Sequence, residues 1–299
     1  MVSGNYGAHF RMAGEKSVAL ATANGTPVNR LGLGTWHLGD SPAKATAEIA
    51  AIRRGICGGL SMIDTAEMYG SGNAEKLVGQ AIGPFARESL YLIDKVLPAN
   101  AGNAAFFTSL HRSLRLLNTS YLDLYLLHWR GQIPLSETVA LMEQAKKQGL
   151  IRDWGVSNFD VSDMEDLMEV SGGTDCCLDQ CLYHLGSRGV EYALLPWLEK
   201  HGMAFMAYCP LAQAGRLQHG LVTAPLVAAI AAKYQLTPFQ LLLAFTLRKP
   251  YVYSIPKAGS IAHVDLNLKA AQAEIDPADW AKLDQAFPAP IRKLPLDVE

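Results

Sequence analysis

Short apolar runs alternate with longer amphipathic stretches along almost the whole chain, and this alternation constrains the fold most. Eight strand-like runs can be identified, and each is followed by a segment of helical period. They read LGLGTW, LSMIDTA, LYLIDK, LDLYLLHW, RDWGVSNF, CLDQ, MAFMAY and VYSIPKAG. Strands that alternate with helices imply right-handed crossovers and a parallel sheet, and nearly continuous apolar strands predict that the sheet is covered.

The spacing of the strand ends separates two parallel architectures. Asp64 to Lys95 is 31 residues, Lys95 to His128 is 33 and His128 to Ser157 is 29, close to one βα unit of about 30 residues per step. Eight such units fit a closed barrel better than an open doubly wound sheet. The first strand-like run, GLGTWHLG, also lacks the third glycine of G-x-G-x-x-G. We therefore predict an α/β fold, a single-domain (β/α)8 TIM barrel.

The N-terminal segments lie outside this repeat. Residues 1–16 are small and polar without the apolar centre of a secretory signal, so they are predicted to be a flexible leader to a barrel domain at 17–299. The next segment, VALATANGTPVNRL, predicts a β-hairpin that turns at Asn24-Gly25. We expect this hairpin to cap the barrel floor.

Composition narrows the class of partner. The 26 basic and 28 acidic residues give a net charge of -2, which indicates neither a nucleic-acid partner nor a membrane surface. No apolar run reaches the roughly 18 residues that a membrane helix needs. Five cysteines at irregular spacing favour free thiols over a disulfide framework. We expect a cytoplasmic monomer that acts on a small molecule.

Polar or aromatic residues end all the strand-like runs. In a barrel of this kind the active site lies at the C-terminal ends of the strands, so these side chains are predicted to converge on one mouth. Tyr69 follows Asp64 by one short loop and can reach the same space. The strand-end residues are Trp36, Asp64, Lys95, His128, Ser157, Asn158, Gln180, Tyr208 and Lys257.

Four of the residues at the predicted mouth can together stabilise charge on an oxygen and move one proton. A free tyrosine has a pKa of about 10, and a lysine ammonium beside Tyr69 is expected to lower it. Asp64 supplies the counter-charge that a buried Lys95 needs, and His128 can donate a hydrogen bond to a substrate oxygen. The set contains no good nucleophile and no metal ligand set. It suits carbonyl reduction, with the hydride supplied by a cofactor because no side chain delivers one.

The remaining strand ends fit such a cofactor. Ser157, Asn158 and Gln180 are neutral donors and acceptors that could hold a carboxamide, Tyr208 offers a flat face for a nicotinamide ring, and Lys257 could meet a phosphate.

Five segments resemble the signature segments of the aldo-keto reductase family: GLSMIDTAEMYGSGNAE, LIDKVLP, LLHWRG, GVSNF and SIPKAG. They occur in family order between about Leu31 and Asn267. The resemblance implies the same barrel, NADPH bound across its mouth, Tyr69 as the general acid, Lys95 and Asp64 as its tuning pair, and His128 as the orienting residue. The cofactor contacts that it implies are Gly34, Thr35, Trp36, Asp64, Ser157, Asn158, Gln180, Tyr208, Leu211, Lys257, His263 and Asn267, and the substrate contacts are Trp36, Tyr69, His128 and Trp129.

Two positions depart from the family pattern at the adenosine phosphate. Many members follow the lysine of the eighth-strand motif with a serine and place an arginine six residues after that lysine. This chain has Ala258 and His263 there. One phosphate ligand is lost and another is weakened, so NADPH remains the expected cofactor while use of NADH stays open.

Two further segments carry expectations. Residues 210–225 are predicted to be a long irregular loop that folds over the cofactor pyrophosphate, with Gly215 and Gly220 as hinges and Arg216 as a phosphate contact. Glu67 is assigned to a solvated loop position without a role.

Three functions compete at this point: an NADPH-dependent aldehyde or ketone reductase, a non-catalytic NADPH-binding redox sensor or regulatory subunit, and a metal-dependent hydrolase. The hydrolase would need clustered ligands, and only Asp64 and His128 could contribute. An aromatic pocket of Trp36, Tyr69 and Trp129 favours small or moderately apolar carbonyls. Compact bacterial members of the family suggest methylglyoxal or diketogluconate as substrates by analogy.

Overall fold

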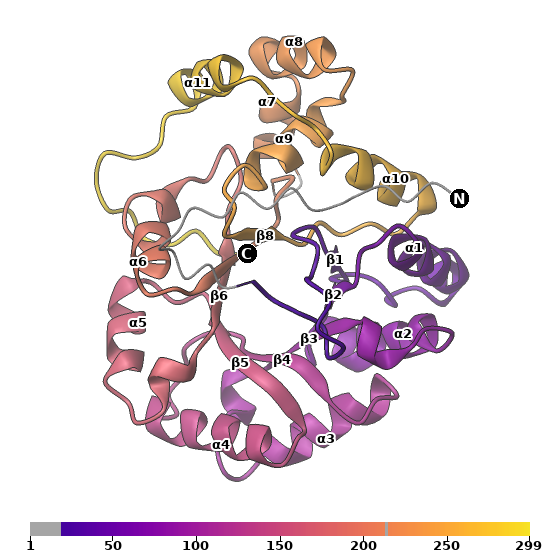
Figure 1. The fold of residues 1–299 in the computed structure, drawn as a ribbon, viewed down its shortest axis with the longest axis vertical. Helices are drawn as coiled ribbons and strands as arrows, with labels where there is room; N and C mark the ends of the chain where they lie inside the picture. Colours follow the sequence, from indigo (N-terminus) through magenta and orange to yellow (C-terminus); the bar gives the residue numbers. More distant parts are fainter. Residues whose placement is uncertain (1–18, 213–214) are drawn as a thin grey trace.

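The computed structural model describes residues 19–212 and 215–299, and within them eight parallel strands form one sheet (Figure 1). The strands lie in chain order, each beside the next. They are β1 (Leu33–Gly34), β2 (Met62–Asp64), β3 (Tyr91–Val96), β4 (Leu122–Leu127), β5 (Ile151–Ser157), β6 (Leu178–Leu182), β7 (Ala204–Tyr208) and β8 (Val252–Ser254).

The sheet closes on itself between its last and first strands. Parallel bridges join Leu31 to Ser254 and Gly34 to Lys257, and the Gly34 amide donates to the Pro256 carbonyl at 3.1 Å. A Cβ on Gly34 would come within 2.6 Å of the Ile255 carbonyl oxygen, so the closure needs glycine there. The predicted single-domain (β/α)8 barrel is confirmed.

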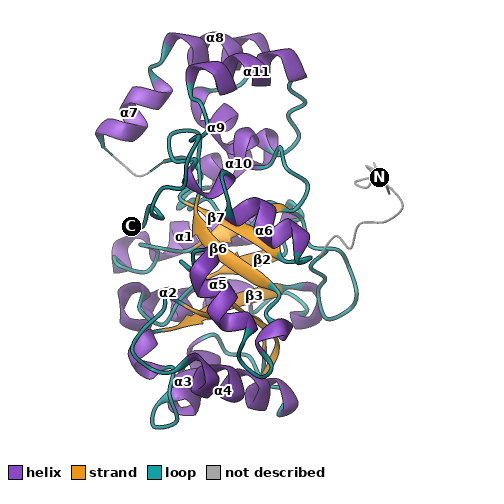
Figure 2. Ribbon diagram, turned by 90° about the vertical axis from the view of Figure 1, so that its left-hand side faces the viewer, coloured by secondary structure: helices purple, strands orange, loops and turns teal. Residues whose placement is uncertain are grey.

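Helices surround the sheet (Figures 1 and 2). They are α1 (Ala45–Cys57), α2 (Asn73–Ile82), α3 (Phe106–Leu116), α4 (Leu135–Lys147), α5 (Val161–Met168), α6 (Leu194–Lys200), α7 (Arg216–Val222), α8 (Pro225–Lys233), α9 (Pro238–Thr246), α10 (Ile261–Ala270) and α11 (Pro277–Ala286). Helices α9 and α11 were not predicted from the sequence. Helix α9 is buried on every side from Gln240 onward, so it has no helical polar period. Its available signal is the capping box of Thr237 and Gln240.

The prediction of an irregular loop at residues 210–225 was wrong in part. Arg216–Val222 form helix α7, and Gly220 lies inside that helix and cannot serve as a loop hinge. Gly215, at φ 99°, does provide the turn before α7. Residues 213 and 214 lie outside the described residues.

The predicted N-terminal hairpin is present as a short turn with one antiparallel bridge between Ala21 and Pro27. Gly25 takes φ 82°, which favours glycine at this turn. Leu20 and Val28 are buried and join the cluster that fills the barrel interior, so the hairpin closes the barrel floor. The predicted leader at 1–16 lies outside the described part of the chain.

Two apolar clusters form the core. The outer one fills the space between sheet and helices. The inner one fills the barrel and includes Met62, Ile93, Leu124, Leu126 and Met206. Because the inner cluster is packed, a ligand can enter only where it gives way to polar side chains, at the C-terminal ends of the strands.

The structure bears on two expectations, one about the cysteines and one about membrane-spanning helices. All five cysteines are free; Cys176 and Cys181 are buried and Cys57 is exposed. Within the described residues no single helix is long and apolar enough to cross a membrane, and only the bent pair α8 and α9 passes on length and composition.

Candidate active site

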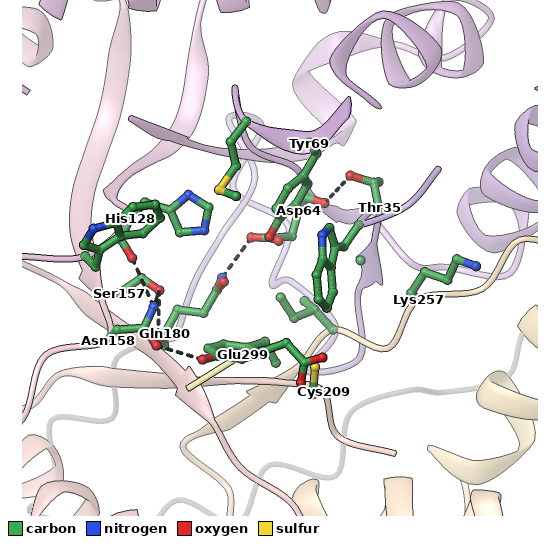
Figure 3. A pocket seen from close by; sticks show the side chains of 16 residues that line it. Thr35, Asp64, Tyr69, His128, Ser157, Asn158, Gln180, Cys209, Lys257 and Glu299 are labelled. Carbon is green, nitrogen blue, oxygen red and sulfur yellow. Dashed lines mark hydrogen bonds between the residues drawn. The ribbon is translucent and has the colours of Figure 1, made fainter. Parts of the chain in front are cut away.

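A pocket of about 780 Å³, partly open to solvent, lies at the C-terminal ends of the strands (Figure 3). Twelve of its lining residues are ones that the sequence analysis selected. They are Gly34, Thr35, Trp36, Asp64, Tyr69, His128, Trp129, Ser157, Asn158, Gln180, Tyr208 and Lys257.

Strand ends position most of these side chains. Asp64, Ser157 and Tyr208 are the last residues of β2, β5 and β7, and His128 directly follows β4. Parallel pairing keeps the strand ends level, as the pairing of Ser157 with Gln180 shows. Residues far apart in the chain therefore meet at one rim.

A buried ion pair lies at the base of the pocket. Lys95, with 0% of its surface exposed, places its Nζ 2.6 Å from Asp64 Oδ1 and 2.7 Å from the Thr65 carbonyl oxygen. The same Nζ lies 3.3 Å from the Tyr69 hydroxyl. All three donor positions of the ammonium thus have acceptors. Lys95 does not line the pocket itself but supports Tyr69 from beneath.

The electrostatics keep the lysine charged. Burial alone would lower the pKa of Lys95, but Asp64 and Tyr69 together outweigh it and raise that pKa. Burial raises the pKa of Asp64, and Lys95 opposes this effect. The 2.6 Å separation of Nζ and Oδ1 is the geometry of a buried ammonium–carboxylate pair.

The expected lowering of the Tyr69 pKa is wrong for this structure. Burial raises the pKa of Tyr69 above its ordinary value of 10.0, Lys95 counteracts this only in part, and Asp64 adds to the rise. The phenol therefore keeps its proton at neutral pH. A group with this property is suited to giving a proton to a developing alkoxide.

His128 lies beside Tyr69, with ring centroids 5.9 Å apart. Burial, aided by the charge of Lys95, lowers the pKa of His128 to about 3, so the imidazole is neutral. Its buried Nδ1 has no hydrogen-bond partner. The tautomer that leaves Nδ1 bare carries its N–H on Nε2, where it can donate to a substrate oxygen.

Amide side chains form one wall of the pocket and fix the ring of Tyr208. Asn158, at φ 61°, donates through Nδ2 to the His128 carbonyl and accepts at Oδ1 from the Tyr208 hydroxyl at 2.8 Å. Gln180 Nε2 donates to Asp64 Oδ2 at 2.8 Å, and Ser157 Oγ donates to the Gln180 carbonyl. Figure 3 shows Asp64, Ser157, Asn158 and Gln180 around one space.

Three predicted cofactor contacts do not line this pocket. Leu211 is partly buried against the outer core. His263 is exposed and Asn267 is buried, and both lie on α10 after Ser260, which caps that helix by accepting from the His263 amide. Lys257 precedes α10 and is exposed at the rim.

Sequence reasoning missed several residues at the site. Four further residues line the pocket: Met68, Cys209, Ile255 and Glu299.

The assignment of Glu67 to a solvated loop was also wrong, because the residue is only 3% exposed. Glu67 accepts from the Leu97 amide at 2.5 Å, from Asn100 Nδ2 at 3.0 Å and from the Ser109 hydroxyl. No local pattern marks a tertiary anchor of this kind.

No group of three or more histidine, cysteine or acidic side chains able to hold a metal ion occurs within residues 19–212 and 215–299.

Comparisons with known proteins agree with the geometry. A model of the aldo/keto reductase family matches residues 30–287. The chain belongs to the aldo/keto reductase family. This aldo-keto reductase is an oxidoreductase that acts on carbonyl groups.

Among its relatives is methylglyoxal reductase YeaE of Escherichia coli K12, 49% identical over 90% of this chain and 94% of that protein. NADH-specific methylglyoxal reductase of the same organism is 30% identical over 66% of this chain and 68% of that protein. A crystal structure of an aldo-keto reductase from Klebsiella pneumoniae in complex with NADPH is 48% identical, with a TM-score of 0.91 over 94% of this chain and 99% of that one.

Glu67 lies between Asp64 and Tyr69 in the chain and joins their loop to the segment after β3. We predict that Glu67→Gln lowers kcat about tenfold through misplacement of Tyr69, with the KM for cofactor unchanged. Glu137→Gln is the matched control, because Glu137 also accepts a backbone amide, from Asn103. Steady-state kinetics of both variants check this, and equal values for Glu67→Gln and wild type would contradict it.

His128 also makes stability depend on pH. Its folded pKa of about 3 lies below the ordinary 6.5, so the unfolded chain binds a proton that the folded protein excludes, and stability falls as pH falls through this window. The contribution between pH 6.5 and 4 is about 3 kcal/mol.

Urea unfolding at pH 7 and pH 4 measures this contribution. His128→Asn should lose less stability than wild type on acidification, by about that amount. Exposed His111→Asn should behave as wild type. An unchanged acid sensitivity in His128→Asn would show that the imidazole is not held neutral.

Proposed function

We propose that this aldo-keto reductase uses NADPH to reduce aldehydes or ketones to alcohols, with Tyr69 as the general acid. One observation carries the proposal. The Tyr69 hydroxyl lies 3.3 Å from the Nζ of a buried Lys95 that is itself paired with Asp64, and it lies in the same pocket as a neutral His128.

The residues present fit a nicotinamide cofactor. Asn158 and Gln180 present amide groups, and the Tyr208 ring is held by its hydroxyl so that it borders the pocket. When bound, the cofactor supplies a hydride to the carbonyl carbon. Lys257 is exposed at the rim and would meet a phosphate of the cofactor, with His263 and Asn267 on α10 as further contacts. The NADPH complex of the Klebsiella pneumoniae relative supports this choice.

The chain's own residues divide the remaining work. His128 donates a hydrogen bond to the carbonyl oxygen and orients it toward Tyr69. The Tyr69 hydroxyl gives its proton to that oxygen as negative charge develops on it, and the Lys95 ammonium stabilises the phenolate left behind. Asp64 keeps Lys95 charged and in place. The packed inner cluster below excludes water from this side of the site.

The pocket favours a small carbonyl substrate. Trp36, Trp129 and Met68 contribute apolar surface, and Trp129 is 40% exposed at the rim. The names of two relatives, both methylglyoxal reductases, support a small 2-oxoaldehyde as the substrate.

Replacement of the proposed acid tests the mechanism. Tyr69→Phe removes only the hydroxyl, and we predict that kcat falls by about 10²- to 10⁴-fold while NADPH still quenches protein fluorescence with near wild-type affinity. Tyr192→Phe, at a 48% exposed tyrosine, is the control. Full-speed turnover by Tyr69→Phe would reject the role, and tight NADPH binding by a wild type that never turns over would favour the sensor function instead.

The phosphate contact is tested separately. Lys257→Ala should raise the KM for NADPH by about 10- to 100-fold, as expected for loss of a charge-assisted hydrogen bond, and leave that for NADH nearly unchanged. The control is Lys200→Ala, at an exposed lysine that ends α6. Parallel assays with both cofactors measure this, and equal effects on the two KM values would reject the phosphate role.

A further inference from the structure

The turn that follows Tyr69 has a strained backbone. Residues 70–72 all take left-handed conformations, with φ of 55°, 54° and 99°. The middle one is Ser71, which is strained there because its Cβ crowds its own backbone. This turn leads directly into α2. The Tyr69 hydroxyl therefore keeps its 3.3 Å distance from Lys95 Nζ only if other contacts hold the turn and the start of α2 in place.

Two buried carboxyl groups join α2 to the strand that carries Lys95. Glu75 lies in the first turn of α2, Asp94 directly precedes Lys95 on β3, and both acidic residues are 0% exposed. Their side chains lie within hydrogen-bonding reach of each other and beside Ser113 of α3. Asp94 Oδ1 also accepts from the Lys95 backbone amide at 2.8 Å. The contact thus spans the gap between the helix after Tyr69 and the strand of its lysine partner.

This pair must hold a proton of its own. Both oxygens of Glu75 and Oδ2 of Asp94 are buried and have no N–H or O–H donor in hydrogen-bonding geometry among the described residues. Two carboxylates cannot hydrogen-bond to each other, whereas a carboxyl group and a carboxylate can. Burial, followed by the charge of Glu75, raises the pKa of Asp94 well above its usual range. Burial also raises the pKa of Glu75. One proton between the two groups therefore persists at neutral pH.

The charged and titratable groups around the pair leave this proton in place. Burial raises the pKa of Glu75 more than Arg112, an exposed residue of α3, lowers it. The carboxylate of Glu67, in the loop after β2, raises that pKa further. On β4, Tyr125 pairs in register with Asp94, and burial keeps this phenol uncharged by raising its pKa well above the ordinary 10.0.

We propose that Glu75 and Asp94 are positioning residues, which share one proton and thereby hold the Tyr69 turn against the strand of Lys95. This inference rests on the proposed function, because it gives the position of Tyr69 a role in proton transfer. Loss of the shared proton leaves two negative charges side by side without water, and their repulsion pushes α2 away from β3. The Tyr69 hydroxyl then moves out of reach of Lys95, and proton transfer slows.

Substitutions at Asp94 separate the hydrogen bond from the titratable proton. Asp94→Asn keeps a donor to Glu75 that does not ionise and an oxygen that can accept from the Lys95 amide, whereas Asp94→Val removes both. In single turnovers with saturating NADPH and a small aldehyde, Asp94→Val should slow hydride transfer about tenfold, and Asp94→Asn should retain most of the wild-type rate. The affinity for NADPH, measured by quenching of protein fluorescence, should be the same in all three proteins.

Tyr125→Phe is the matched control. It removes a buried hydroxyl beside Asp94 on β4 and leaves the carboxyl pair intact. This variant should keep the wild-type rate of hydride transfer. A loss as large as that of Asp94→Val would show that the packing of this layer matters rather than the pair, and would overturn the proposal, as would a wild-type rate in Asp94→Val.

Two further readouts report the proton itself and need only wild type and Asp94→Asn, so they hold even if Asp94→Val does not fold. The infrared difference spectrum of the two proteins at neutral pH should contain the carbonyl band of a protonated carboxyl group. As pH rises from about 7 to about 10, wild type should lose more of its rate than Asp94→Asn, because only wild type can lose the shared proton.

Absence of the infrared band, or parallel pH profiles of wild type and Asp94→Asn, would overturn the proposal. Failure of the proposed function would look different. If Tyr69→Phe turned over at full speed, the positioning role would fall together with the role of Tyr69, whereas the infrared band would still report whether Glu75 and Asp94 share a proton.

Discussion

The site depends on one interaction, the buried ion pair of Lys95 and Asp64. An ammonium without water must have its hydrogen-bond acceptors supplied by the protein, and here they are Asp64, the Thr65 carbonyl and the Tyr69 hydroxyl. Asp64 in turn accepts from Gln180. A buried charge that lost a partner would destabilise the fold by about 3–5 kcal/mol. Tyr69 and Gln180 are hydrogen-bond partners of these two charges, so the need to keep the charges paired also holds both side chains in place.

Burial around this pair assigns different tasks to its neighbours. It raises the pKa of Tyr69 and lowers that of His128 to about 3. At neutral pH the phenol therefore keeps its proton and can give it to a substrate, and the imidazole is a neutral hydrogen-bond donor. The lysine does not make the resting phenol acidic. Its charge becomes useful when negative charge appears on the oxygen of Tyr69, so it favours the state after proton transfer over the state before it.

The sequence predicts this site well where chemistry coincides with the end of a strand. Asp64, His128, Ser157 and Tyr208 are found this way because the barrel repeats in sequence, and a repeat places equivalent positions at one rim. Residues that depend on tertiary contacts are not found. Glu67 looks solvated until Leu97 and Asn100 fold against it, and Glu299 enters the pocket only because distant loops hold the segment before it. The direction of the Tyr69 pKa was missed because charge can be read from sequence but the depth of burial cannot. Helix α9 was missed because a helix buried on all sides has no polar face to reveal its period.

A double-mutant cycle on kcat tests the central claim most directly. Lys95→Met and Asp64→Asn are made singly and together, and hydride transfer is measured in single turnovers with saturating NADPH and a small aldehyde. If Asp64 acts by keeping Lys95 charged beside Tyr69, the rate of hydride transfer in the double variant should equal that of Lys95→Met alone. Losses that multiply in the double variant would show that the two side chains act independently, and would contradict the account.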